Sequence, residues 1–305
     1  MKQIKSGHAL KMAASDRLLR IFTILFASIM VLVTVYPLYF VIIASFSDPN
    51  SVVLGKVVFF PDAVNVKSYL RVFHHDRIWM SYRNTIIYTV TYTALNVFAT
   101  MTAAFVFSRK KLVGARLCQL AVLFTMYFSG GMIPGYFNIR SLGLLNSMWA
   151  LILPGAISTY NMIIARTYIS NSIPEALNEA ATIDGCQPLT YYFRIVLTLS
   201  GPIIGVLTLY AAVGMWNSYF SALLYIQSAE KMPLQMILRE ILVQSEISAK
   251  DMLSAADVSD IVSNAALKEQ LKYALVVVAS IPLLVLYPFL QKFFVKGVMV
   301  GSLKG

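Results

Sequence analysis

The chain has 305 residues and a formal net charge of +11, yet only 13% of its residues are charged while 58% are hydrophobic. An ordinary soluble domain carries about 25% charged residues, so this composition, with a mean hydropathy of +0.70, excludes a soluble enzyme or binding domain. We therefore predict a membrane protein whose charges lie in the segments outside the bilayer.

Six apolar stretches without a charged residue are each long enough to cross a bilayer, for which about 20 residues suffice. They cover residues 21–47, 84–108, 117–139, 141–165, 195–229 and 273–291. Each stretch is continuously apolar rather than alternating, which predicts helices and not barrel strands. We expect an all-α polytopic membrane protein with six transmembrane helices, a tight hairpin at Arg140 and a fifth span that begins near Pro202.

The basic residues predict how the chain is oriented. The apolar run after the N-terminal segment 1–20 is too long for a signal peptide, so we expect an uncleaved first helix with this segment in the cytoplasm. The cytoplasmic parts then hold 14 of the 25 basic residues and four of the 14 acids, which divides the net charge into +10 inside and +1 outside. The other expected parts are a six-helix domain at 21–293, outer segments at 48–83 and 230–272, a cytoplasmic loop at 170–199 and a cytoplasmic tail at 294–305.

The spans lack the groups that would power transport from within. No Asp, Glu, Lys, Arg or His lies inside any of the six stretches, whereas ion-driven carriers usually keep ionisable groups at mid-membrane. No GxxxxGK[ST] phosphate loop occurs either. We predict a non-enzymatic chain with no catalytic residue, bound cofactor or metal, and any energy for transport must come from another polypeptide.

A cluster of basic residues lies between the second and third stretches: Arg109, Lys110, Lys111 and Arg116. It could bind nucleic acid or anionic lipid, but basic residues at this place are typical topology determinants. We interpret the cluster as a topology determinant and expect no nucleic-acid partner.

Residues 173–188, IPEALNEAATIDGCQP, predict a short helix, a turn and a second helix between the fourth and fifth stretches. Ser172 and Glu175 have the spacing of a capping box, Gly185 can supply a left-handed stop, and Pro188 suits the first turn of the next helix. A short amphipathic acidic helix of this kind suits insertion into a groove on a partner protein. The alternative is a helix lying on the bilayer surface, although such helices are usually basic.

The segment EAATIDG, followed after nine residues by IVL, resembles the EAA motif of bacterial ABC importer permeases, which reads EAA, three residues, Gly, nine residues, I-x-L-P. The matching residues are Glu179, Ala180, Ala181, Gly185, Ile195 and Leu197. Thr198 stands where that motif ends in Pro. Further segments, among them FSGGMIPGYFNIRSLGLLNSMWALILPGAIS and FFVKGVMVGSLKG, are similar to the sugar-importing branch related to the maltose permeases, especially its polysaccharide and oligosaccharide subgroup.

The resemblance implies a type I ABC importer permease-like fold in the bacterial inner membrane. It also implies partners of four kinds: a second homologous permease subunit, two ATPase subunits that bind ATP and Mg²⁺, an extracytoplasmic solute-binding protein, and an oligosaccharide substrate. That substrate is either of the acidic uronate type or of the neutral malto type. The helix around Glu175 to Ile183 would be a coupling helix. Its expected ATPase-docking residues are Glu175, Leu177, Glu179, Ala180, Ala181, Asp184 and Gly185.

Polar and aromatic residues within the predicted spans are candidates for the substrate path. Trp216, Asn217 and Tyr219 cluster in the fifth stretch, and sugars are typically held by aromatic faces and amide groups. The alternative is that these residues pack helices together, as polar side chains in membranes often do. Asn96 and Tyr160 carry the same ambiguity.

The glycine-rich sequence 130–135 interrupts the third stretch. It predicts either a break that shapes an external gate or a docking surface for the extracytoplasmic binding protein, or a simple kink. The segment LQMILREILVQ predicts an amphipathic helix outside the membrane in the outer segment 230–272. The sequence leaves two other functions possible: an ion-coupled secondary carrier and a non-transporting membrane scaffold.

Overall fold

The computed structural model describes residues 14–74, 76–109, 113–252, 270–289 and 291, and among them every regular element is helical. The all-α prediction is confirmed. Three described helices are long and apolar enough to cross a membrane: α1 (Ala14–Phe46), α4 (Asp76–Ser108) and the C-terminal helix Gln270–Phe289. The number becomes five if each of two sharply bent helix pairs is one span. The tail at 294–305 and most of segment 1–20 lie outside the described residues.

The third predicted span is broken. It consists of α5 (Ala115–Tyr127) and α6 (Met132–Ser141), whose axes differ by 112°. Gly131 between them has a φ of 87°, a backbone conformation that glycine adopts without steric cost. The predicted break in the glycine-rich sequence is therefore confirmed as a sharp bend.

The predicted tight hairpin at Arg140 is wrong, because Arg140 lies in the last turn of α6 and the chain does not turn there. The turn follows at Gly143 and Asn146, which both have left-handed backbone angles. The fourth predicted span is then divided into α7 (Trp149–Ile152), the 3₁₀ turn η1 (Leu153–Gly155) and α8 (Thr159–Ser172).

The fifth predicted span begins at α12 (Gly201–Trp216), as expected from Pro202. A bend of 81° at Ser200 separates it from the preceding helical run. That run follows α9 (Glu175–Ile183) and consists of α10 (Pro188–Tyr191), the π-helical segment η2 (Tyr192–Val196) and α11 (Leu197–Leu199). The remaining elements are α2 (Pro49–Val53), α3 (Lys67–Phe73), α13 (Phe220–Tyr225), η3 (Ala229–Lys231) and α14 (Leu234–Met252), the last of which confirms the predicted amphipathic helix.

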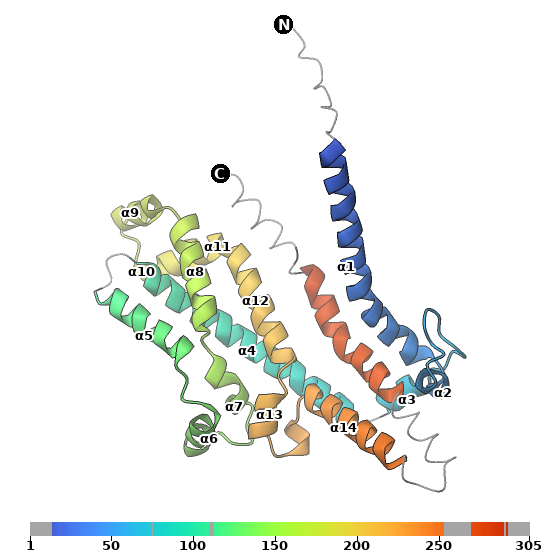
Figure 1. The fold of residues 1–305 in the computed structure, drawn as a ribbon. Helices are drawn as coiled ribbons and strands as arrows, with labels where there is room; N and C mark the ends of the chain where they lie inside the picture. Colours follow the sequence, from blue (N-terminus) through green and yellow to red (C-terminus); the bar gives the residue numbers. More distant parts are fainter. Residues whose placement is uncertain (1–13, 75, 110–112, 253–269, 290, 292–305) are drawn as a thin grey trace.

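Figure 1 shows how these elements divide between the two ends of the molecule. The beginning of α1 and the segment α9 to α10 lie toward one end, whereas α2, α3, α6 and α14 lie toward the other. The long helix α4 crosses between them and packs against both α8 and α12.

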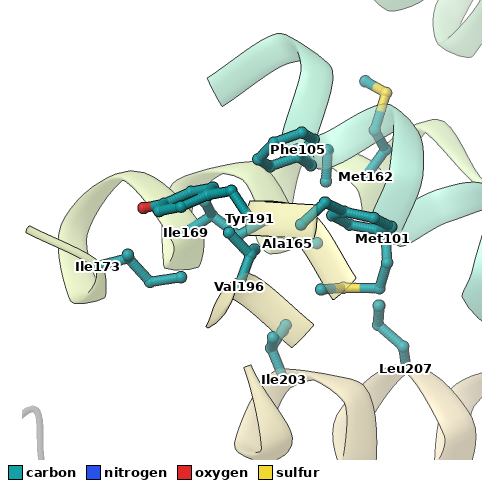
Figure 2. Packing of buried hydrophobic residues seen from close by; sticks show 12 residues of the cluster. Met101, Phe105, Met162, Ala165, Ile169, Ile173, Tyr191, Val196, Ile203 and Leu207 are labelled. Atoms are coloured by element: carbon teal, nitrogen blue, oxygen red, sulfur yellow. The ribbon is translucent and has the colours of Figure 1, made fainter. Parts of the chain in front are cut away.

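A buried apolar cluster joins α4, α8, η2 and α12, and Figure 2 shows its side chains meeting from these elements. Met101 and Phe105 come from α4, and Leu207 from α12. The cluster also includes Ile173, two residues before α9 begins, and Tyr191, the last residue of α10. Both ends of the α9 segment are therefore anchored in the same core.

A second buried contact holds the other end of the molecule together. Gln270, at the start of the C-terminal helix, is fully buried and accepts a hydrogen bond of 2.6 Å from the Ser68 hydroxyl on α3. Its amide donates to the backbone carbonyls of Ser45, Ser47 and Asn65. One side chain thus links the end of α1, the segment that follows it, α3 and the C-terminal helix.

We expect Gln270→Ala to lower the free energy of unfolding by about 2–4 kcal/mol, because it leaves buried polar groups without partners. Thermal unfolding of the purified protein in detergent measures this. Gln227→Ala is the matched control, since the Gln227 side chain is exposed. Equal melting temperatures for Gln270→Ala and Gln227→Ala would contradict the assigned role.

Candidate docking surface and translocation path

The helix α9 begins after a proline and not at a capping box. Ser172 is the last residue of α8, and Pro174 occupies the N-cap position without a side-chain hydrogen bond. The capping-box prediction is wrong because the residue before a proline favours an extended backbone, and Ile173 adopts it with φ −108° and ψ 108°. The Glu175 carboxylate instead accepts a hydrogen bond of 3.3 Å from the Asn178 amide.

The end of α9 is a two-hydrogen-bond turn of the Schellman type. Gly185 has a φ of 73°, which confirms the predicted left-handed stop. The Gly185 N–H donates to the Thr182 carbonyl at 3.1 Å, and the Cys186 N–H donates to the Ala181 carbonyl at 2.8 Å. A short reversal follows, and α10 begins at Pro188 as predicted.

One face of α9 is exposed. Ala176, Glu179, Ala180 and Ile183 are spaced as neighbours on a single helical face, and all four are exposed. The side chain of Ile183 is 86% exposed, and that of Leu189 on α10 is 69% exposed. We name the segment from α9 to α10, residues 175–191, the knob.

The expected docking residues divide between the two sides of the knob. Glu175, Leu177, Glu179, Ala180, Asp184 and Gly185 are exposed. Ala181 is half-buried and packs against the apolar cluster of the bundle, so it supports the knob from within. The docking candidates predicted from the sequence did not include Ile183 and Leu189. Two large apolar side chains in a short polar segment could have indicated them.

Aromatic rings and one cation fix the knob to the bundle. The Tyr192 ring lies 4.8 Å from the Phe105 ring, and its hydroxyl lies 3.1 Å from the Thr102 hydroxyl on α4. The Arg109 guanidinium lies over the rings of Phe105 and Tyr191, at 4.2 and 4.7 Å from their centroids. These contacts join the C-terminal end of the knob, and the residue that follows it, to α4.

Trp216, a candidate path residue, is placed in the protein core. It is 4% exposed, and its indole N–H donates to the Ala279 carbonyl on the C-terminal helix at 3.1 Å. Its ring meets Tyr82 edge to face at 5.8 Å. This geometry favours the packing alternative for Trp216.

The other path candidates differ in exposure. Asn217 directly follows α12, and Tyr219 directly precedes α13. We expected both residues inside the fifth span, whereas they lie in the connection between these two helices. Both are exposed, and the Arg239 guanidinium lies 5.5 Å from the Tyr219 ring centre. Tyr160, at the start of α8, is 57% exposed. Asn96 is buried, and its amide donates to the Gly155 carbonyl at 2.8 Å.

A line of polar side chains on α4 lies around Asn96. Asn96 Oδ1 and the hydroxyls of Ser81, Thr89, Thr93 and Thr100 are buried and have no hydrogen-bond partner within the described part of the chain. A cleft of about 300 Å³ lies between α4 and α12 beside Thr93. We name these five residues the polar seam.

Metal-binding side chains are dispersed over the molecule. Across the residues that the structure describes, no three His, Cys, Asp or Glu side chains come together as a metal site. Cys118 and Cys186 are both free thiols.

Comparison with known proteins decides the family. Residues 78–300 match the family described as binding-protein-dependent transport system inner membrane component. The chain belongs to this family. A relative from Bacillus subtilis (strain 168), the polygalacturonan/rhamnogalacturonan transport system permease protein YtcP, is 42% identical over 95% of this chain and 98% of its own length. Protein LplC of the same organism is 38% identical, over 98% of this chain and 99% of its own length.

A solved structure agrees with the family. A bacterial ABC transporter involved in the import of the acidic polysaccharide alginate contains a chain with a TM-score of 0.83 and 30% identity. The match covers 94% of this chain and all of that chain. This protein is therefore an ABC carbohydrate importer permease with the corresponding all-α membrane fold.

We expect Trp216→Ala in the permease to lower the free energy of unfolding by about 3–5 kcal/mol, because a large buried side chain and its hydrogen bond are lost. Tyr219→Ala, at an exposed position, should change it by less than about 0.5 kcal/mol. Thermal unfolding in detergent, followed by sugar uptake of each variant, distinguishes a residue that packs helices together from one that lines the substrate path. A Trp216→Ala permease that melts like the wild type but transports no sugar would place Trp216 on the path.

Proposed function

We propose that this permease is one half of the membrane pair of an ATP-driven sugar importer and that the knob docks into a cytoplasmic ATPase subunit. The observation that carries the proposal is the mounting of the knob, which is exposed on one face and anchored on the other in the apolar cluster shared by α4, α8 and α12. An element so mounted can transmit a rigid-body movement to the bundle.

Shape and apolar burial carry the docking energy in this proposal. An exposed ion pair at Glu179 contributes about 0–1 kcal/mol. Full burial of one side chain such as Ile183 or Leu189 in an ATPase groove contributes about 1.5–3 kcal/mol. The small residues Ala176 and Ala180 on the exposed face of α9 allow the partner backbone to approach closely.

The assembly that we propose has a second homologous permease subunit, two ATPase subunits and an extracytoplasmic solute-binding protein. The ATPase subunits bind ATP and Mg²⁺ and hydrolyse ATP, and this chain is not an enzyme. The knob faces the cytoplasm, as do both termini. The excess of basic residues in segments on that side supports this orientation, as does the common end of the molecule at which the knob and the start of α1 lie (Figure 1).

We further propose that the substrate is an acidic oligosaccharide. The name of the relative YtcP refers to polygalacturonan and rhamnogalacturonan, and the solved neighbour imports the acidic polysaccharide alginate. A neutral malto-oligosaccharide is the second candidate, because the maltodextrin transport system permease protein MdxG of Bacillus subtilis (strain 168) is a relative at 25% identity.

In proteoliposomes that hold the complete assembly and its binding protein, we expect ATP-dependent uptake of short galacturonate or alginate oligomers at least about tenfold faster than uptake of maltotriose, since one charge-assisted contact contributes that much discrimination. Radiolabelled uptake measures it. Faster uptake of maltotriose would reverse the substrate assignment, and uptake that follows an ion gradient without ATP would indicate a secondary carrier.

We expect Gly185→Val to reduce sugar uptake about tenfold while the permease still inserts and folds, because a left-handed valine costs about 2 kcal/mol and displaces the knob. Gly185→Asn should keep most uptake, since asparagine tolerates this conformation. The matched control is Gly143→Val, which has a similar φ of 69° and equally open surroundings but lies outside the knob. Normal uptake and ATPase stimulation by Gly185→Val would count against docking through the knob.

A further inference from the structure

We infer that the permease binds a phosphate-bearing anion in a cavity beside the knob. The cavity has a volume of about 880 Å³ and lies between the end of α4, the start of α5, the second half of α8 and the start of α9. Three arginines on three different helices line it: Arg109 directly after α4, Arg116 on α5 and Arg166 on α8.

The charge of the cavity lining is strongly positive. Glu175 is the one acidic residue among the described lining residues, against three arginines. Within the described part of the chain, none of the three guanidinium groups has a carboxylate oxygen within 4 Å. The described lining therefore carries a net charge of +2, from three arginines and one glutamate. Control of topology requires basic residues near a span but does not require arginines of separate helices to converge on one cavity.

Two of the arginines are held in place before any ligand binds. Arg109 is fixed by its contacts with the rings of Phe105 and Tyr191. The Arg166 Nε–H donates to the Phe107 carbonyl in the last turn of α4 at 3.0 Å. Its terminal N–H groups are left for another acceptor. Guanidinium groups that are pre-positioned in this way match the oxygens of a phosphate, with which arginine forms paired hydrogen bonds.

The floor of the cavity is apolar, which suits a lipid headgroup as the source of the phosphate. Phe105, Ile169 and Ile173 line it and belong to the buried cluster of Figure 2. A lipid bound here would place its phosphate among the arginines and the upper part of its acyl chains against the apolar wall. A soluble phosphate has the same charge but uses only the arginines, so experiment must distinguish the two sources.

An occupant would also touch the knob. Glu175 and Asn178 of α9 line the same cavity, and Arg109 borders a second cavity of about 360 Å³ under α9. Anion binding would therefore adjust the position of α9 and the rate of transport. This regulatory link rests on the proposed function, whereas anion binding itself does not.

The test is direct binding to the purified full-length permease in detergent. Native mass spectrometry counts retained phosphatidylglycerol against phosphatidylcholine, and calorimetry titrates inorganic phosphate. We expect retention of phosphatidylglycerol by the wild type and about tenfold weaker binding to Arg116→Gln, whose side chain is exposed and not needed for folding. Arg166→Gln should weaken binding similarly. Arg194→Gln, an exposed arginine near the knob but outside the cavity, is the matched control and should bind normally.

Binding of inorganic phosphate that Arg116→Gln weakens, without retention of lipid, would support the site with a soluble ligand. The proposal is overturned if neither ligand binds the wild type, or if Arg116→Gln and Arg194→Gln bind alike. It is also overturned if the arginine variants lose the ATPase subunit while anion binding is unchanged, because the cavity would then serve that partner. Knob variants that still dock the ATPase subunit and transport sugar normally, with anion binding intact, would contradict only the proposed function.

Discussion

The packing of α4 against α8, η2 and α12 is the constraint on which the rest of the permease depends. Phe105 and Met101 fill the space between these helices, and the chain enters and leaves the knob through Ile173 and Tyr191 of the same cluster. Protein cores are close-packed and rearrange between discrete states rather than deforming continuously. A displacement of α9 would therefore act on α4, α8 and α12 together.

The sequence predicted the parts of this arrangement that depend on local chemistry. Charge-free length located α1, α4 and the C-terminal helix, and the Gly185 and Pro188 pair located the turn of the knob. Hydropathy could not show the bends, because Gly131, Ser200 and the turn at Gly143 change the direction of the chain without changing its polarity. The glycine-rich sequence by itself predicts only that the helix either breaks or kinks there.

Side-chain roles were less predictable, because they depend on which helix lies opposite. Trp216 has the amphipathic character of a sugar-binding residue, yet its partner is the Ala279 carbonyl, 63 residues away. Ala181 belongs to a docking motif by its spacing but faces its own bundle. In the same way, the basic cluster between the second and third stretches was interpreted as a topology determinant, since nothing local indicated that Arg166 of another helix lines a cavity with Arg109 and Arg116.

The polar seam of α4 has a consequence for how easily water reaches this helix. Each buried hydroxyl without a partner costs about 1–3 kcal/mol in a dry interface, and that cost disappears once water reaches the group. Water that enters the cleft at Thr93 would therefore be stabilised by that hydroxyl more than by the apolar side chains around it. The boundary between α4 and α12 is thus easier to hydrate at Thr93 than a purely apolar boundary of the same size.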